Sequence, residues 1–318
     1  MSATDIAAKP KQGGLLVWVQ RLWLAVVALF IAGAAATQWS HLAGYEWRPS
    51  IPLLVVALGF AVVRKFWGGV LWAFLMATFA RIPLGARFAE NLEIYFLTNL
   101  ASYVPGSLWY IPWRMKLYRE RGVSLAHTSV GSAVESLILV VANGVLGLPV
   151  LGALFRDQPS VDPRIVVAML LLGALALQPP LLRFLFRLFK RLVGRDITEP
   201  RFTYGQILIA VGLAFVAALT AGGSVFFMVK SLDASLTLDQ YFSLTCSFSL
   251  AWVIGFLTPI APGGLGVREG LLVWLLRSRM PLPVATAAAL ATRLIFIFED
   301  LFWAGVAVSW RRLSRARA

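Results

Sequence analysis

Long apolar runs alternate with short polar or basic stretches along almost the whole chain. Most runs reach the length of about 20 residues that a membrane-spanning helix needs, and none shows the polar-apolar alternation of a strand. We therefore expect an all-α polytopic membrane protein of one domain, residues 1–318, with about eight transmembrane helices. The two short runs at 50–63 and 66–80 would tilt, extend or form partial spans. The runs fall at about residues 16–37, 50–63, 66–80, 92–112, 126–151, 165–182, 205–229, 240–260 and 283–310.

Composition agrees with a membrane protein. Apolar residues make up 59% of the chain and charged residues only 14%, whereas soluble domains carry about 25% charged residues. The net charge of +14 comes from short basic stretches between apolar runs. That placement is typical of the positive-inside pattern and of contact with anionic lipid, so we expect no nucleic-acid partner.

The basic residues also predict an orientation. If every run from 16–37 to 92–112 crosses the membrane, a cytoplasmic N-terminus leaves 19 of the 29 basic residues inside. We therefore expect both termini in the cytoplasm, with the chain in the cytoplasmic (inner) membrane of a bacterium. Arg81 and Arg87 fit least well, because this arrangement places them at the outer headgroups. Residues 34–36 resemble a signal-peptidase site, but later apolar runs favour an uncleaved first span.

One stretch interrupts the apolar pattern near the C-terminus. Proline and glycine from Pro259 to Gly266 break the helix, and Arg268 and Glu269 follow directly. The run 240–260 is long enough to cross alone, but 267–276 is too short to return. We therefore predict a re-entrant hairpin. Irregular backbone at membrane depth is tolerated where it lines a cavity or packs inside protein, so this stretch is a candidate site.

A second broken stretch, residues 103–107, lies in the first half of the chain. Glu135 follows Gly106 by 29 residues, and Arg293 follows Gly263 by 30. In the predicted topology the helices that carry Glu135 and Arg293 run in opposite directions. This pattern is typical of an inverted repeat, which places the binding site where the repeats meet; chance similarity of helix breaks is the alternative. The half-repeats would span 66–151 and 240–310.

These motifs resemble a known family. The stretch 262–270 followed by Arg293, and 103–106 followed by Arg114 and Glu135, are similar to the transmembrane region of lysylphosphatidylglycerol synthase. Its members are also called flippase-like integral membrane proteins. The resemblance implies a polytopic inner-membrane domain that binds or moves lipids. No aminoacyl-transferase domain follows the last apolar run, so we expect no synthase activity.

The second motif supplies a candidate site for a lipid headgroup. Arginine suits phosphate because its planar fork donates two hydrogen bonds. Glycine backbone N–H groups and the helix start that follows them attract anions. Alternatively, Arg268 and Glu269 form a pair that orients the loop, or Glu269 only stabilises the first helical turn. The candidate headgroup residues here are Pro262, Gly263, Gly264, Gly266, Arg268 and Glu269.

Five further charged residues complete the candidate set. Glu135 and Arg293 lie well inside apolar runs, where ionisable groups usually pair or face a cavity. We expect either an ion pair between them that ties the half-repeats together, or a headgroup site. Arg114 would contact phosphate or anchor the helix at the inner interface. Glu299 and Asp300 would carry a proton or form an inward charged face.

The sequence thus predicts translocation of an anionic phospholipid or a lipid-linked glycan or isoprenoid lipid. One alternative is an accessory subunit of an envelope lipid or polysaccharide assembly. Another is an intramembrane lipid-modifying transferase with Glu135 or Asp300 as base, although no catalytic constellation is visible. We expect no enzyme activity, cofactor or metal, since His41, His127 and Cys246 lie far apart. Expected partners are anionic lipids, a second copy of the chain or an envelope-biosynthesis protein.

Overall fold

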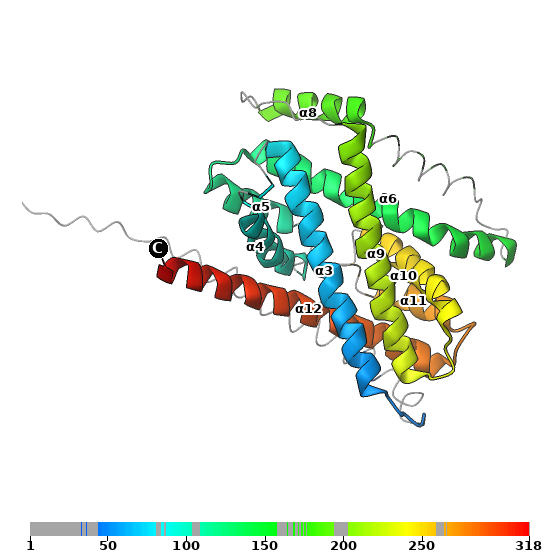
Figure 1. The fold of residues 1–318 in the computed structure, drawn as a ribbon. Coiled ribbons are helices and arrows are strands. Elements are labelled where there is room, and N and C mark those ends of the chain that lie inside the picture. The colour runs from blue at the N-terminus through cyan, green and yellow to red at the C-terminus, as the bar shows by residue number, and fades with distance from the viewer. Residues whose placement is uncertain are drawn as a thin grey trace, which may run out of the picture.

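The structure is a computed structural model of an α-helical bundle (Figure 1). It describes residues 44–80, 84, 85, 87–103, 109–157, 177–193, 203–258, 264 and 266–317, with isolated residues at 33, 36, 164, 168, 171, 173 and 175. The run 16–37 with its cleavage site, and most of 165–182, lie outside the described residues. The helices are α3 (Ile51–Ala80), α4 (Phe88–Asn99), α5 (Tyr110–Arg119), α6 (Leu125–Asp157), α8 (Pro179–Val193), α9 (Tyr204–Leu232), α10 (Tyr241–Leu257), α11 (Val267–Leu276) and α12 (Leu282–Arg317), with two short 3₁₀ helices, η1 (Leu100–Tyr103) and η2 (Leu238–Gln240).

Five helical segments in these ranges are long and apolar enough to cross a membrane. The described part of the chain contains no strand. The prediction of an all-α membrane protein is therefore confirmed. The segments are Ile51–Phe79, Leu125–Leu154, Tyr204–Leu232, Leu238–Leu257 and Leu282–Ser314.

The runs 50–63 and 66–80 are not separate elements. They form the single 30-residue helix α3, so the division predicted between them, at Arg64 and Lys65, is wrong. Lys65 is the fifteenth residue of this helix and lies at its middle. The helix continues because both cations meet carboxylates of α12, Glu299 and Asp300, inside the bundle.

The run 92–112 does not cross the bundle either. It forms α4 and α5, of 12 and 10 residues, which return to the end where they began. Arg87, just before α4, donates a hydrogen bond of 3.2 Å to the carbonyl oxygen of Arg121, just after α5. Arg121 also forms an ion pair with Glu90. Because α4 and α5 form a hairpin and the runs 50–63 and 66–80 form one helix, the described residues cross the bundle fewer times than the expected number of about eight.

The second hairpin, α10 and α11, agrees with the prediction. Arg279, just after α11, donates a hydrogen bond to Ser243 in the first turn of α10. The chain therefore returns to the end of the bundle where α10 begins. The two hairpins start at opposite ends, because α4 follows the end of α3 while α10 follows the end of α9, which runs antiparallel to α3 (Figure 1).

Glycine allows the long helices to approach the hairpins closely. Gly68 of α3 packs so near Tyr95 of α4 that an added Cβ would lie 2.3 Å from the tyrosine oxygen. Gly222 of α9 packs in the same way against Thr245 of α10, where an added Cβ would lie 2.0 Å from the threonine hydroxyl oxygen. A glycine thus brings each hairpin against the long helix that precedes it.

We call the end of the bundle where α3 and α12 finish the basic end. Arg121 and Arg311 both contact Glu93 there, at 3.6 and 3.7 Å. The amphipathic helix α8 lies across this end (Figure 1) and buries Phe186 against His127, with ring centroids 5.6 Å apart. Arg87 lies beside Arg121, so the prediction that these two residues lie on opposite sides of the membrane is wrong.

Candidate functional site

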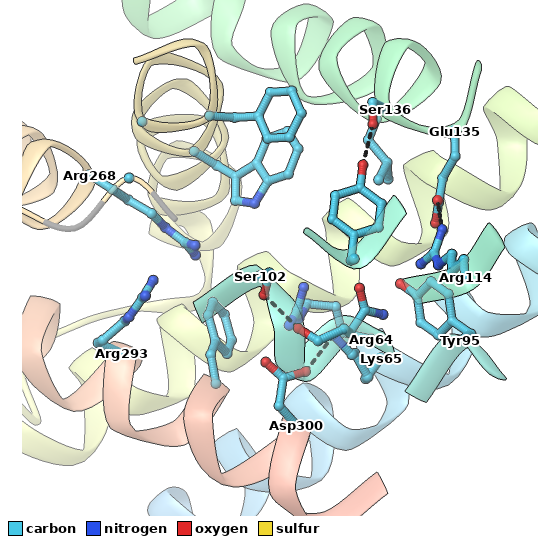
Figure 2. A pocket seen from close by; sticks show the side chains of 18 residues that line it. Arg64, Lys65, Tyr95, Ser102, Arg114, Glu135, Ser136, Arg268, Arg293 and Asp300 are labelled. Atoms are coloured by element: carbon cyan, nitrogen blue, oxygen red, sulfur yellow. Dashed lines mark hydrogen bonds and ion pairs between the residues drawn. The ribbon is translucent and has the colours of Figure 1, made fainter. Parts of the chain in front are cut away.

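A cavity of about 200 Å³ lies at the middle of the bundle, between the two hairpins (Figure 2). Ser102, Tyr110 and Arg114 line it from the helices on either side of the first broken stretch, and Gly264 and Arg268 line it from the second stretch and the helix that follows. The two motifs that the sequence singled out therefore meet at one site. The charged residues in the lining are Arg64, Lys65, Arg114, Arg268, Arg293, Glu135 and Asp300.

Two adjacent ion pairs join α3 to α12 beside this cavity. Lys65 pairs with Asp300, and Arg64 pairs with Glu299, with Arg64 Nε donating to Glu299 Oε2 at 3.3 Å. The Glu299 side chain is fully buried. Sequence reasoning missed the two cations because it placed them at the division between two apolar runs. A signal was present, since two neighbouring cations in 50–80 match two neighbouring carboxylates in the last helix.

Arg114 is a buried brace of the first hairpin rather than an interface anchor. Its side chain is 1% exposed and forms an ion pair with Glu135 of α6. Arg114 Nε donates to Thr98 Oγ1 at 3.0 Å, and the guanidinium lies 4.1 Å from the centre of a Trp72 ring. The predicted pair of Glu135 with Arg293 is therefore wrong. Glu135 pairs within its own half because α5 packs directly on α6.

The second hairpin is held by an ion pair with the charges reversed, since the carboxylate lies on the short helix and the arginine on the long helix. Glu269 of α11 lies 3.7 Å from Arg293 of α12, and its other oxygen accepts the N–H of Gly266 at 2.8 Å. The predicted pair of Arg268 with Glu269 is not the contact observed, because neighbouring helical residues point in different directions. The guanidinium of Arg268 lies instead 4.5 Å from the ring centre of Phe248.

Glycine shapes the second break. Gly264 and Gly266 have φ angles of +71° and +83°, which L side chains rarely adopt. A Cβ on Gly264 would lie 2.8 Å from the carbonyl oxygen of Gly255 at the end of α10. The chain therefore turns next to the cavity, and Arg268, two residues after Gly266, lines it. Pro262 and Gly263 lie outside the described residues.

Arg268 and Arg293 turn their guanidinium groups toward each other at one side of the cavity (Figure 2). In all, five cationic side chains line the cavity but only two carboxylates, Glu135 and Asp300. Two guanidinium groups that converge in a buried space repel each other, and an anion that lies between them offsets this repulsion. The arrangement therefore suits an anion that accepts hydrogen bonds from both guanidinium groups.

Comparison with known proteins gives no family for this chain. No protein-family model matches it, and no curated protein matches it. Within the described ranges, no three His, Cys, Asp or Glu side chains gather where they could hold a metal ion.

Proposed function

We propose that this protein moves lipids with an anionic, phosphate-containing headgroup between the leaflets of a bacterial cytoplasmic membrane. The observation that carries the proposal is the pair Arg268 and Arg293, which converge in a cavity at the middle of the spanning bundle. A phosphate that crosses the hydrocarbon region needs charge compensation at that depth, which these arginines supply. The resemblance of the two motifs to flippase-like membrane proteins points the same way. An anionic phospholipid and a lipid-linked glycan or isoprenoid both carry such a phosphate.

The proposed machinery is an inverted repeat, with α3–α6 as one unit and α9–α12 as the other. These units extend the predicted half-repeats 66–151 and 240–310. The contacts between helices support the repeat, because α3 packs on α9, α6 on α10 and α12 on α4. The ion pairs that hold the two hairpins support it too, since each joins a short helix to the long helix that follows. Rocking of the two units would expose the cavity to each leaflet in turn.

The charge distribution supports a cytoplasmic location for the basic end. Twelve basic residues of the described helices and their flanks lie near that end and five near the opposite end, as the positive-inside rule requires. With the first run crossing the membrane, this orientation keeps both termini inside. The twelve are Arg87, Lys116, Arg119, Arg121, Arg183, Arg187, Lys190, Arg191, Arg311, Arg312, Arg315 and Arg317, and the five are Arg48, Arg156, Lys230, Arg277 and Arg279.

The contacts of the two cavity carboxylates favour translocation over an intramembrane transferase. A transferase would need Glu135 or Asp300 as a general base. Each of them lies in a buried ion pair, with Arg114 and Lys65 respectively, so proton transfer to it would neutralise one member of the pair and leave the other charge uncompensated.

The test is a leaflet assay with purified protein in vesicles. Fluorescent phospholipids are followed by chemical quenching of the outer leaflet, and loss of protected signal reports movement. We expect faster movement of an anionic lipid than in empty vesicles. Arg268→Ala should lower the rate about tenfold to a hundredfold, the range expected for lost charge-assisted hydrogen bonds. Arg268→Lys should restore only part of it, because lysine lacks the planar fork.

Arg48→Ala is the matched control. Arg48 is an exposed arginine that contacts only Glu46 among the ion pairs of the described residues, at 3.5 Å. Its removal should leave the rate unchanged. If no anionic lipid moves faster than in empty vesicles, the translocation proposal fails. Lipid movement that appears only when a partner protein is added would favour an accessory subunit.

A further inference from the structure

The wall of the central cavity indicates which headgroup it takes. We infer, on the basis of the proposed translocation, that the substrate headgroup is a phosphodiester bearing a small uncharged hydroxylated group, such as glycerol. Headgroups that carry an ammonium group are rejected. Three features of the cavity support this inference: the contacts of its carboxylates, an amide that faces it, and its volume.

The carboxylates of the cavity are already engaged by cations. Glu135 pairs with Arg114, and Asp300 pairs with Lys65. An ammonium headgroup would have to displace one of these buried partners and leave it without a counter-charge, which is costly inside a protein. Five cationic side chains and two carboxylates line the cavity, and Glu299 and Glu269 pair with Arg64 and Arg293 from outside the lining; the remaining excess of positive charge also disfavours an ammonium group. The cavity therefore discriminates against amines while it attracts phosphate.

Neutral polar groups line the cavity away from Arg268 and Arg293. Asn99 lies at the end of α4, and its side-chain Nδ2 is buried with no hydrogen-bond partner among the described residues. Nearby, Ser102 donates to the backbone oxygen of Asn99 at 2.6 Å, and Tyr110 shares a hydrogen bond of 2.8 Å with Ser136. Buried N–H groups are normally hydrogen-bonded, so a ligand that offers an acceptor oxygen to Asn99 Nδ2 would be stabilised here.

A headgroup hydroxyl meets this need. It can accept from Asn99 Nδ2 and exchange hydrogen bonds with the hydroxyl groups of Ser102 and Tyr110. Figure 2 shows Ser102 and Ser136 apart from the two converging arginines, so phosphate and hydroxyl groups would occupy different parts of the cavity. The contacts thus match a phosphate followed by a small polyol.

The volume sets an upper bound on the headgroup. The cavity measures about 200 Å³, whereas pockets for drug-sized ligands span about 300–1,000 Å³. A phosphate with glycerol is a group of modest size. A glycan of several sugars would not be enclosed. Among the proposed substrates, this favours an anionic phospholipid over a lipid-linked glycan.

The experiment compares headgroups on identical acyl chains in the vesicle assay. The panel is phosphatidylglycerol, phosphatidic acid, phosphatidylethanolamine and lysyl-phosphatidylglycerol, with a polyprenyl phosphate that carries a disaccharide. We expect phosphatidylglycerol to move at least tenfold faster than the two amine lipids and the glycan lipid. Comparable or faster movement of an amine or glycan lipid would overturn the inference and leave lipid translocation standing.

Two variants test the assignment of the cavity walls. Asn99→Ala should slow phosphatidylglycerol about threefold to tenfold but leave phosphatidic acid, which lacks the glycerol group, unchanged. Asn143→Ala is the control, because Asn143 donates to Leu139 within α6 and does not line the cavity. Arg268→Glu should reduce the preference for phosphatidylglycerol over phosphatidylethanolamine. An equal effect of Asn99→Ala on both anionic lipids would contradict the role of Asn99.

A failure of the proposed function has a different signature. If no lipid of the panel moves, translocation itself is wrong. Uptake of water-soluble glycerol 3-phosphate into the same vesicles, without lipid movement, would show that the cavity serves a free phosphate ester, and it would overturn the lipid assignment.

Discussion

Charged residues at membrane depth play two distinct structural parts in this protein. Arg114 and Glu135 hold the first hairpin on α6, and Glu269 and Arg293 hold the second on α12. Arg268 instead stacks on Phe248 and lines the cavity. Removal of one member of a buried pair leaves an uncompensated charge, so loss of activity in such a variant reports folding as well as binding. Arg268 is therefore the better position for a functional test.

Gly264 supports a residue-scale prediction about folding. Gly264→Ala should lower the melting temperature and the yield of folded protein, because alanine is strained at φ +71° and its Cβ would lie 2.8 Å from the Gly255 oxygen. Thermal unfolding of the detergent-purified protein measures this. Gly270→Ala is the matched control, since a Cβ there meets nothing within 4 Å and alanine favours the helix. Equal melting of the two variants would contradict the strained turn.

The residues of the site were easier to predict than their partners. Gly264, Arg268 and Arg293 were identified because glycine and ionised side chains are rare in apolar runs, and the structure brings all three to the cavity. The partner of Glu135 was predicted wrongly. A pair with Arg293 was one of the two expected roles because both residues lie inside apolar runs, but that position does not determine which neighbouring helix each one packs against. Glu135 pairs with Arg114 because α5 lies on α6.

At the scale of elements, α3 shows why sequence divided one helix into two. Two adjacent cations normally mark the end of a membrane span, because an isolated charge in the hydrocarbon region is costly. Here Glu299 and Asp300, more than 230 residues away along the chain, neutralise Arg64 and Lys65. A local pattern contains no information about such a partner. The prediction that 92–112 crosses the membrane was wrong for a related reason. The length of this run fits a crossing, but the residues form two short helices, α4 and α5.

Contacts at the basic end support an element-scale prediction. Glu93→Gln should lower the melting temperature, because Glu93 of α4 contacts Arg121 and Arg311 at 3.6 and 3.7 Å and so ties α12 to the first hairpin. The loss should be on the order of 1 kcal/mol and should shrink in high salt. Thermal unfolding at low and high ionic strength checks it. Glu46→Gln, which removes an almost fully exposed pair with Arg48, should have no effect.

At the scale of the whole molecule, the two hairpins enter the bundle from opposite ends and meet at its centre. Lys65 and Asp300 lie near the midpoints of α3 and α12, so the cavity is about equally far from both ends. A site at that depth can communicate with either leaflet when the two units move against each other. This geometry requires that each hairpin ends on the side of the membrane where it begins. If 92–112 crossed the membrane, α6 would start on the opposite side and run in the opposite direction.

Cysteine labelling of the four hairpin ends tests this arrangement. Single cysteines at Gly85, Glu120, Asp239 and Arg279 replace exposed residues, in a chain whose buried native cysteine is changed by Cys246→Ala. In intact cells an impermeant maleimide should label positions 239 and 279 but not 85 and 120. The latter two should react only after the membrane is permeabilised, because the basic end is proposed to lie in the cytoplasm.

The pairwise outcome separates hairpin geometry from orientation. If 85 and 120 react together and 239 and 279 react together, both hairpins return to their starting side whichever side that is. The reverse pattern, with 85 and 120 labelled from outside, would keep the hairpins but invert the proposed orientation, against the distribution of basic residues. Labelling of 85 and 120 from different sides would mean that 92–112 crosses the membrane. The helices after it would then run opposite to the proposed repeat, and the cavity would no longer join two inverted units.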